Sequence, residues 1–420
     1  MRRVRGTPEP TLVSYYFFLF FIHESDFVDT TVSFLLIFPS GYIAICVFYN
    51  LIFAVCSLFK SRGSIKDHFH PAHIALLIPG YKEDNVIVKV AQCALRHDYP
   101  RAFFDVIVIA DSFQKKTLDE LRSLPVKLIE VSFSESTKAK SLNAAMKTLV
   151  GSYDLAVVLD ADNIMENGVL DKMSQAFRSG HKAIQCHRTA KNSSNVVSRL
   201  DGLSEEIGNS ILRKGHNVLG LSSDIAGSGF GCQFDLYREA MQGINGISED
   251  KSLEIELLRR QVNIHYLFDA VVYDEKVQNQ KHLLIQRSRW FSAHYQFAFK
   301  YFLIGWQKFF SEWNIDLLNK TIQHTLLPRS MTFVAILILA FFAVLTGNFT
   351  LLVGASVMFS LMTLAMALAT PKKFYTIDTL HAMAYLPFTL VTLIHAALIA
   401  KPSQKAFDHT PHHDLDTDHQ

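Results

Sequence analysis

Two aspartates separated by one residue follow an apolar run and could together hold a hard divalent cation. The run is Leu155–Leu159, and Asp160 and Asp162 come directly after it. Mg²⁺ and Mn²⁺ prefer carboxylate oxygens completed by substrate phosphates, and the ion then neutralises charge on a diphosphate leaving group. An ordinary turn with two solvated acids is the alternative that the same pair also suits.

Other polar residues stand where a phosphate, a nucleoside or an acceptor could meet them. Lys138 opens a helical pattern and could reach a phosphate as a point charge, although a solvated helix start also explains it. Asp111 and Glu83 follow apolar runs, where they suit hydrogen bonds to a ribose or base as well as ordinary loops. Asp250 lies at the start of another helix, where the dipole favours a carboxylate; its functional interpretation is a general base on an acceptor hydroxyl.

A third group combines basic and aromatic side chains near the end of the polar region. Arg289 can pair bidentately with a diphosphate, and Trp290 offers an apolar face on which a sugar ring could stack. A belt of Arg and Trp at a membrane surface is the alternative. The segment Phe297–Phe310 mixes aromatics with Lys300 and Lys308, which predicts an amphipathic helix in the membrane interface.

The elements that must position these residues lie between about residues 73 and 268. Short β-branched runs alternate there with helical patterns, which predicts an α/β domain with a mostly parallel sheet. The predicted strands are Ile74–Ile78, Val106–Ile109, Val126–Val131, Leu155–Leu159 and Ala183–Cys186. The predicted helices include Val86–Leu95, Leu118–Arg122, Thr137–Thr148 and Val169–Phe177. Ligands of such sheets bind at the carboxyl ends of the strands, where several of the carboxylates stand.

Charge is scarce in this chain of 420 residues, and its absence is concentrated. Charged residues make up 19% and hydrophobic residues 49%, against a usual charged share of about 25%. No charged residue occurs in Thr30–Phe59, Ser330–Pro371 or Thr379–Ala400. A helix crossing a bilayer needs roughly 20 apolar residues, so these stretches are predicted spans. Ser330–Pro371 is long enough for two spans, with a turn at Gly347-Asn348.

Two further apolar runs leave alternatives open. Thr11–His23 suits a short span, an interfacial helix or a signal peptide, and the lack of a small-residue cleavage site before Glu24 disfavours the signal peptide. Lysines flank both ends of Leu380–Ala400, so either this run is re-entrant or interfacial, or the tail lies outside. Pro387 permits a broken helix there.

Charge and cysteine usage bound the location and the partners. Arginines at the N-terminus and lysines after the second run place the N-terminus and the chain after Lys60 on the cytoplasmic side of the cell inner membrane. A net charge of +2 gives no reason to expect a nucleic-acid partner. Five scattered cysteines without a CxxC pair predict reduced, structural thiols. The His- and Asp-rich tail His409–Gln420 could bind metal, although a solvated, disordered tail is the favoured alternative.

Taken in order, these motifs resemble the membrane-integrated branch of glycosyltransferase family 2, the group of cellulose, chitin, hyaluronan and poly-N-acetylglucosamine synthases. The family pattern of D, DxD, (T/E)ED and QxxRW is matched by Asp111, Asp160-x-Asp162, Ser248-Glu249-Asp250 and Gln286-x-x-Arg289-Trp290. Three further elements agree with the family: Ile78-Pro79-Gly-Tyr81-Lys-Glu83, Lys138-Ala-Lys-Ser-Leu142-Asn143 and Gly227-Ser228-Gly229-Phe230. The resemblance covers about residues 70–330.

The resemblance implies a GT-A-like domain and inverting transfer from a UDP-sugar, assisted by Mg²⁺ or Mn²⁺. The nucleotide-binding residues it implies are Pro79, Tyr81, Glu83, Asp111, Lys138 and Asp160. The metal ligands it implies are Asp162 and Asp160, and the catalytic base is Asp250. The residues implied at the acceptor and the diphosphate are Gly229, Phe230, Gln286, Arg289 and Trp290.

The function expected from these features is a hexosyl- or N-acetylhexosaminyltransferase that builds a β-linked polysaccharide processively. The alternative is transfer of one sugar to a lipid-linked acceptor. A nonenzymatic scaffold or transporter is disfavoured, because the acids at the strand ends are all present. The chain departs from the family in Ser248, where Thr is usual, and it lacks the FxVTxK gating motif, which weakens a cellulose assignment.

Five regions are predicted along the chain. Residues 1–66 form an N-terminal membrane segment with one or two spans, and residues 67–295 form the cytoplasmic catalytic domain. Residues 296–330 form interfacial helices, residues 331–400 a C-terminal transmembrane region, and residues 401–420 a polar tail. The expected partners are a UDP-sugar donor, a growing glycan or lipid-linked acceptor, and the lipid bilayer.

Overall fold

The computed structural model describes residues 36–60, 70–149, 151–246 and 248–401. The predictions for Thr11–His23 and for the tail His409–Gln420 lie outside these residues. The chain divides into two compact units. One contains the described residues up to Asn50 together with Leu327–Thr363, and the other contains Leu51–Leu326 and the described residues from Leu364 onward.

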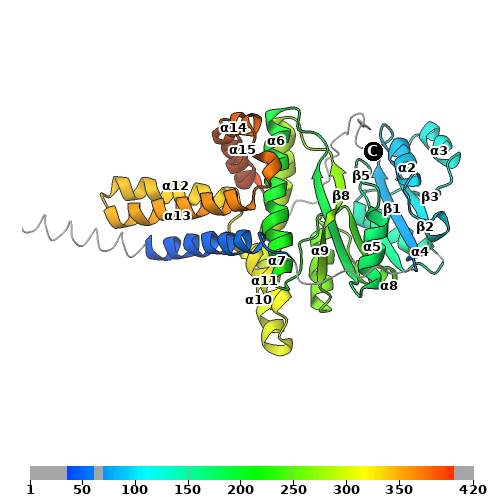
Figure 1. Cartoon of the computed structure of the whole chain (residues 1–420), viewed down its shortest axis with the longest axis horizontal. Coiled ribbons are helices and arrows are strands. Elements are labelled where there is room, and N and C mark those ends of the chain that lie inside the picture. Colours follow the sequence, from blue (N-terminus) through cyan, green and yellow to red (C-terminus); the bar gives the residue numbers. More distant parts are fainter. Residues whose placement is uncertain (1–35, 61–69, 150, 247, 402–420) are drawn as a thin grey trace, which may run out of the picture. The chain divides into compact units, whose positions relative to one another are not determined.

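The second unit is built on a mixed sheet of eight strands (Figure 1), in the order β3-β2-β1-β4-β7-β6-β8-β5. The strands are β1 Ile74–Tyr81, β2 Phe104–Asp111, β3 Lys127–Val131, β4 Leu155–Val158, β5 Ile164–Met165, β6 Ala183–Ala190, β7 Phe230–Gln233 and β8 Ile264–Asp274. The pairs β3–β2, β2–β1, β1–β4 and β6–β8 run parallel. The predicted α/β fold class and all five predicted strands are therefore confirmed.

The strands that the sequence did not predict carry the antiparallel pairings. Strand β7 pairs antiparallel with β4 and β6, and β5 pairs antiparallel with β8. Strand β7 has four residues, one of them glycine, and β5 has two, so neither offers a period that can be read. The sheet is consequently parallel through the first four predicted strands and mixed beyond β4.

Helices cover both faces of this sheet. Along β1, the side chains of Leu76 and Ile78 join one core cluster and that of Leu77 joins another, because successive residues of a strand point to opposite faces. The helices of this part of the chain are α2 Ile87–Leu95, α3 Lys115–Arg122, α4 Lys138–Thr148, α5 Val169–Arg178, α6 Val196–Gly208, α7 His216–Val218, α8 Phe234–Met241 and α9 Glu249–Arg259. The four helices predicted between the strands correspond to α2, α3, α4 and α5.

A π-helical segment, Asn209–Gly215, continues α6 into α7. Its last residue, Gly215, packs directly against the backbone of Phe53, because a Cβ at Gly215 would lie 2.3 Å from the Phe53 carbonyl oxygen. Segments of this helix type occur often at functional sites. Here the missing side chain of Gly215 leaves room for the backbone at Phe53, near the C-terminal end of the apolar helix Leu36–Cys56.

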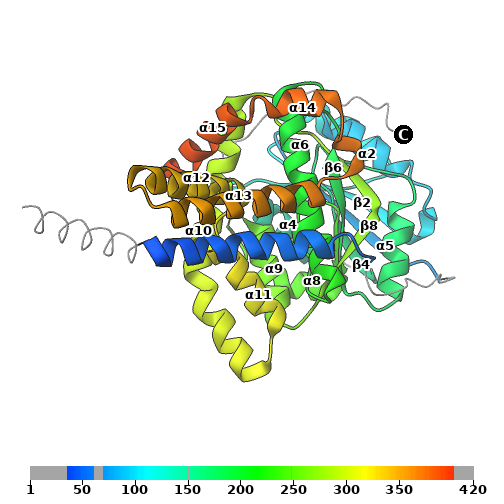
Figure 2. The ribbon, with the colours of Figure 1, turned by 60° about the vertical axis from the view of Figure 1, so that its left-hand side comes forward.

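Helices α10 Gln280–Glu312 and α11 Ile315–Thr325 pack side by side and are yellow in Figures 1 and 2. The predicted Gln286–Trp290 and Phe297–Phe310 segments belong to the single 33-residue helix α10, so the boundary predicted at residue 295 falls inside a helix. Large aromatic side chains stand exposed around its C-terminal half: Phe299 85%, Phe310 76% and Trp313 70%. Exposed apolar patches of this kind mark surfaces that meet lipid or a partner.

Gly305 lies where α10 meets α11. A Cβ at Gly305 would lie 2.0 Å from Thr321 Oγ1, so the Gly305→Ala substitution must push the helices apart. We expect it to lower the free energy of unfolding by about 1–3 kcal/mol, the usual cost of overpacking. Thermal unfolding of the purified protein in detergent measures this cost.

The matched control is Gly354→Ala, because nothing lies within 4 Å of a Cβ built at Gly354. Alanine forms helix more readily than glycine, so this variant should unfold at or slightly above the wild-type temperature. A Gly305→Ala variant as stable as the wild type would show that α11 can move away from α10 without a loss of free energy of unfolding.

Among the described residues, two helices are long and apolar enough to cross a membrane, Leu36–Cys56 and α13 Phe349–Ala369. Helix α12 Arg329–Leu345 precedes α13, and the predicted turn between them lies at Gly347, with φ of +64°.

The last apolar run is bent. Helices α14 Ile377–Met383 and α15 Leu386–Ile399 meet at 51°, with Pro387 in the first turn of α15. Helix α15 packs against α10. A bend of this size fits either a broken span or a re-entrant course, so these alternatives stay open.

Candidate active site

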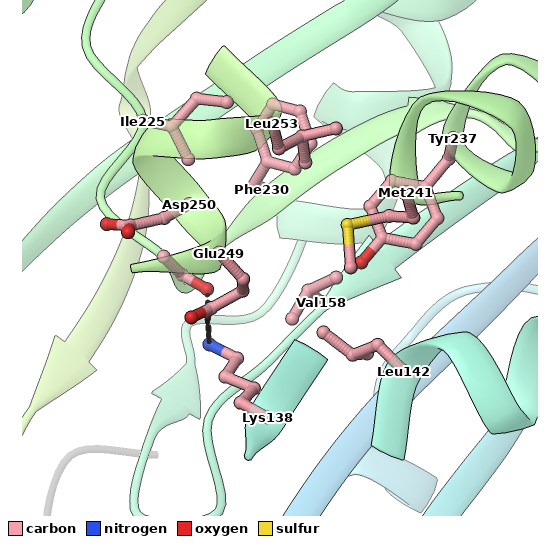
Figure 3. A pocket seen from close by; sticks show the side chains of 11 residues that line it. Lys138, Leu142, Val158, Ile225, Phe230, Tyr237, Met241, Glu249, Asp250 and Leu253 are labelled. Atoms are coloured by element: carbon pink, nitrogen blue, oxygen red, sulfur yellow. Dashed lines mark hydrogen bonds and ion pairs between the residues drawn. The ribbon is translucent and has the colours of Figure 1, made fainter. Parts of the chain in front are cut away.

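Lys138 is the centre of a cluster of polar groups from four parts of the fold (Figure 3). It is the first residue of α4, whose N-cap Thr137 accepts a hydrogen bond from the Lys140 amide at 3.2 Å. The Lys138 ammonium donates to the Asp160 carboxylate, which follows β4, and to the Gly227 carbonyl at 2.7 Å. Its Nζ lies 3.4 Å from Oε1 of Glu249 in the first turn of α9.

A small pocket lies beside this cluster, between α4, α8, α9 and the sheet. The residues that line it are Lys138, Leu142, Val158, Ile225, Gly227, Phe230, Tyr237, Met241, Glu249, Asp250 and Leu253. The structure therefore brings the predicted residues Lys138, Phe230 and Asp250 to one place. Gly229, also predicted, has φ of +62° and packs closely, because a Cβ there would lie 2.9 Å from Val272 Cγ2.

Burial and neighbouring charges act in opposite directions on the two ends of the Lys138–Glu249 pair. Burial alone would lower the pKa of Lys138, but the carboxylates of Asp160, Glu249 and Asp250 outweigh it and raise this pKa. Burial raises the pKa of Glu249 to about 7, and the negative charges of Asp250 and Asp160 add to the effect, although Lys138 opposes it. Lys138 thus stays charged, and Glu249 titrates near neutral pH.

Glu249 belongs to the Ser248-Glu249-Asp250 motif, but the sequence predicts no separate role for it. It is 9% exposed, whereas its neighbour Asp250 is half-buried and accepts a hydrogen bond from the Lys251 amide at 2.8 Å. A signal was available, because Glu249, Leu253 and Leu257 recur every four residues on the buried face of α9.

The raised pKa of Glu249 predicts a pH dependence of stability. Between about pH 4.5 and pH 7 the folded protein holds a proton that the unfolded chain has released, so raising the pH destabilises the fold. The Glu249→Gln variant lacks this titration. We expect the wild type to lose about 3 kcal/mol more than this variant on going from pH 5 to pH 8.

Thermal unfolding of both proteins at the two pH values checks this expectation, because the difference between them removes the contribution of the titrating groups that do not interact with Glu249. Parallel losses of stability in both proteins would contradict the assignment of the raised pKa to Glu249.

Three of the predicted nucleotide-binding residues, Pro79, Tyr81 and Asp111, lie toward the carboxyl ends of two parallel strands. Tyr81 at the end of β1 is in register with Asp111 at the end of β2, and Pro79 lies two residues earlier on β1. Ser112 Oγ donates to Asp111 Oδ1 at 2.9 Å. Asp111 is 1% exposed, and its Oδ2 accepts no hydrogen bond within the part of the chain that the structure describes. That oxygen fits a donor from a ligand, such as a ribose hydroxyl or a base N–H.

Asp160 and Asp162 are chemically suited to a divalent cation. Among the described residues no cluster of three or more His, Cys, Asp or Glu side chains could hold a metal by itself. Two carboxylates completed by substrate phosphates are a usual arrangement for Mg²⁺. The Asn163 amide nitrogen, in the orientation that satisfies its neighbours, lies 3.1 Å from Asp162 Oδ1 and 3.0 Å from Asp274 Oδ1, which orients the Asp162 carboxylate.

Arg287, which lies among the predicted residues of α10, joins this helix to α6. Arg287 binds Asp201 of α6, and its guanidinium lies 4.0 Å from the centre of the Trp290 ring. Trp290 is 46% exposed. Gln286 Oε1 is buried and has no hydrogen-bond partner in the described part of the chain. The structure thus places Gln286, Arg289 and Trp290 together on one helix, and none of them lines the pocket beside Lys138.

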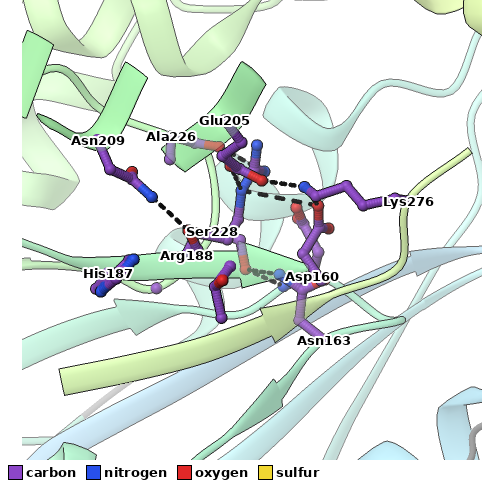
Figure 4. Close-up of polar contacts among 12 residues, drawn as sticks. Asp160, Asn163, His187, Arg188, Glu205, Asn209, Ala226, Ser228 and Lys276 are labelled. Carbon is purple, nitrogen blue, oxygen red and sulfur yellow. Dashed lines mark hydrogen bonds and ion pairs between the residues drawn. The ribbon is translucent and has the colours of Figure 1, made fainter. Parts of the chain in front are cut away.

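A second polar network, which the sequence did not predict, fixes the loop that contains Ala226 and Gly227, next to the Lys138 cluster (Figure 4). Arg188 of β6 donates to the Ala226 carbonyl at 2.9 Å and to Glu205 Oε1 at 2.7 Å. Lys276, 5% exposed, binds Glu205 and Asp274. Burial would raise the pKa of Glu205, but Arg188 and Lys276 overcome it and lower this pKa. Glu205 lies 17 residues from Arg188 and 71 from Lys276 in the chain, so no local pattern shows these two pairings.

Comparison with known proteins bears on the site. Residues 70–293 match the family described as glycosyltransferase like family 2. Curated relatives include a beta-monoglucosyldiacylglycerol synthase of Synechocystis sp., 26% identical over 276 residues, which are 61% of this chain and 55% of the relative. The same enzyme of Trichormus variabilis is 24% identical over 260 residues, 59% of this chain and 52% of the relative. The chain spans about half the length of the curated relatives it matches.

Among solved structures, a mannosyltransferase of Pyrobaculum calidifontis in complex with GDP-Man and Mn²⁺ has a TM-score of 0.48 and 14% sequence identity. The similarity covers 86% of this chain and 97% of that one. A likeness of this size identifies neither a donor nor an acceptor.

Proposed function

Because this chain belongs to the glycosyltransferase-like family 2, we propose that it transfers a single hexose from a UDP-sugar to the hydroxyl group of a lipid acceptor at a membrane surface. The observation that carries the proposal is the convergence of Lys138, Asp160 and Asp250 beside the pocket. The curated relatives, which are named for the product monoglucosyldiacylglycerol, support a lipid acceptor. The two helices suited to cross a membrane support the same location.

The sequence alone favoured processive synthesis of a polysaccharide, with single transfer to a lipid as the alternative. The relatives' names favour the alternative, because each describes a lipid that carries one glucose. The proposed acceptor is therefore a diacylglycerol-like lipid with one free hydroxyl, and the proposed product carries one hexose.

The arrangement suggests the division of labour in the reaction. Asp250 takes the proton of the acceptor hydroxyl, and the hydroxyl oxygen attacks the anomeric carbon from the face opposite the leaving group. The bond from that carbon to the diphosphate oxygen breaks, and UDP leaves with the electron pair. Lys138 neutralises charge on the leaving diphosphate as a fixed cation. A divalent ion held by Asp160 and Asp162 would supply further charge neutralisation there.

The membrane arrangement completes the proposal. The proposed location of the catalytic domain is the cytoplasmic side of the inner membrane, which the basic residues near Lys60 support. The exposed aromatics Phe299, Phe310 and Trp313 suit the interfacial layer of a bilayer, where a lipid hydroxyl is presented. The sequence predicts both the cytoplasmic location and an amphipathic helix in the membrane interface.

The test is a transfer assay with purified protein, Mn²⁺ and diacylglycerol in mixed micelles. UDP-glucose, UDP-galactose, UDP-N-acetylglucosamine and GDP-mannose are offered in turn with a radiolabelled sugar, and the products are separated by thin-layer chromatography. We expect one labelled lipid of the mass of a monohexosyl-diacylglycerol with one of the UDP-sugars. A ladder of longer products, or a water-soluble polymer, would sink the proposal.

A further inference from the structure

We infer that Lys320 of α11 is a positioning residue for sugar transfer, which acts through Asp224 on the loop of residues 224–229. The inference deepens the proposed function, because it concerns the reaction of the same site. One end of this loop contacts the proposed catalytic groups, and the other end is anchored to α11, a helix outside the pocket.

At its catalytic end the loop contacts the charged groups directly. The Gly227 carbonyl accepts from Lys138 Nζ at 2.7 Å, and Ser228 Oγ accepts from the Asp160 amide at 3.0 Å. Gly227 has φ of +84°, and a Cβ built there would lie 3.6 Å from Asp250 Oδ2. A displacement of this loop therefore displaces a partner of Lys138, the backbone at Asp160 and the surroundings of Asp250 together.

At its other end the loop is anchored by buried charges. Lys320 Nζ binds Asp224 Oδ1 and lies 2.5 Å from Glu254 Oε1. Gln323, one turn further along α11, donates to Asp224 Oδ2 at 3.0 Å, and Lys251 Nζ lies 3.4 Å from the same oxygen. The Lys320 side chain is 1% exposed and that of Asp224 is 7% exposed. Two lysines and two acids thus form a buried cluster with no net charge.

The same cluster reaches the helix that carries Asp250. Glu254 Oε2, one turn along α9 from Asp250, accepts from the Ile225 amide at 3.1 Å and from Lys251 Nζ at 2.9 Å. Helix α11, the loop and α9 are therefore joined through one set of ion pairs. Lys320 does not line the pocket, so it acts on the reaction only through these neighbours.

This geometry predicts a larger effect on turnover than on donor binding. The strand ends at Tyr81 and Asp111, where the donor nucleotide is expected, receive no contact from the cluster in the described hydrogen bonds and ion pairs. A misplacement of about 1 Å in catalytic groups can cost roughly 10²-fold in rate. Removing one partner of a buried ion pair destabilises a fold more than replacing both partners by neutral groups.

The test compares Lys320→Met, Asp224→Asn and the double variant that carries both changes. For each we measure the thermal unfolding temperature in detergent, the kcat for UDP release and the KM for the UDP-sugar donor. We expect both single variants to lose stability and roughly 10–100-fold in kcat, with donor KM within about threefold of the wild type. In the double variant charge is balanced again, so the unfolding temperature should return while kcat stays low.

A double variant that regains stability and turnover together would show a merely structural role and overturn the inference. Wild-type kcat in either single variant would overturn it as well. The matched control is the double variant Lys127→Met and Asp105→Asn, a lysine–aspartate pair of the same domain with 2.9 Å between Nζ and Oδ2. Neither residue contacts the 224–229 loop in any described hydrogen bond, so kcat should not change.

UDP release without any acceptor separates this inference from the proposed function. Hydrolysis of the donor by water gives free sugar and UDP, and it uses the same loop whatever lipid is glycosylated. If the wild type hydrolyses a UDP-sugar but labels no lipid, the proposed acceptor is wrong, and the variants still test Lys320. If lipid is labelled and the variants hydrolyse at the wild-type rate, the inference alone fails.

Discussion

Replacing Asp250 by asparagine is expected to lower the turnover for sugar transfer by roughly 10²–10⁴-fold, the usual contribution of a general acid–base group. Asparagine keeps the size of the side chain and removes its ability to accept a proton. Asp250 lines the pocket and lies beside the Gly227 backbone, which is where the proposed reaction requires a base. The measurement is kcat for UDP-sugar consumption in the presence of the lipid acceptor, with donor KM determined in parallel.

The control for this variant is Asp235→Asn on α8, since the Asp235 side chain is 75% exposed and pairs with Arg238 at the surface. It should keep wild-type kcat. Near-wild-type turnover in Asp250→Asn would refute the assignment of the base. Glu249 is buried, and its Oε1 lies 3.4 Å from Lys138 Nζ, so it would then be the next residue to replace.

Replacing Asp162 by asparagine is expected to weaken the dependence of the reaction on divalent metal. Outer partners of metal ligands alone contribute about 10–100-fold in metal affinity, so loss of a ligand should raise the Mn²⁺ concentration for half-maximal activity by at least about tenfold. Asp162 is 6% exposed and held by Asn163, so the substitution also removes a fixed, oriented carboxylate. Activity measured across a Mn²⁺ titration, after removal of bound metal by a chelator, gives the shift.

The comparison variant is Asp171→Asn, because Asp171 is exposed in the first turn of α5. Its Mn²⁺ titration should overlay that of the wild type. An unchanged titration in Asp162→Asn would remove this residue from the metal site and leave Asp160 as the only predicted carboxylate ligand.

The placement of the residues expected at the donor could be predicted because its signals are local. An apolar run followed by Asp160, Asp111 or Tyr81 shows both the strand and its carboxyl end, and the structure places these residues at or just after strand ends. Lys138 could be predicted for the same reason, since the start of α4 follows from the Thr137–Thr148 pattern. Each of these inferences needs only neighbouring residues.

The groups that support the site could not be predicted in this way. Lys320 and Asp224 are 96 residues apart, and their pairing depends on how α11 packs against the loop. One clue was nonetheless present in the sequence of α11, whose buried residues Leu317, Lys320, Thr321 and His324 follow the spacing of a buried helix face. A lysine at such a position requires a buried acid, although the pattern does not say which one.

Helix α10 has a mechanical consequence. Its 33 residues run without a break from the segment that carries Gln286, Arg289 and Trp290 to the exposed aromatics at Phe299 and Phe310. At a rise of 1.5 Å per residue it is a lever about 50 Å long, so a tilt of about 5° at one end moves the other by about 4 Å. A bilayer that tilts the aromatic end, through its thickness or lateral pressure, must therefore move the end that faces α6. The lipid around this enzyme would then set its rate as well as supply the acceptor that we propose.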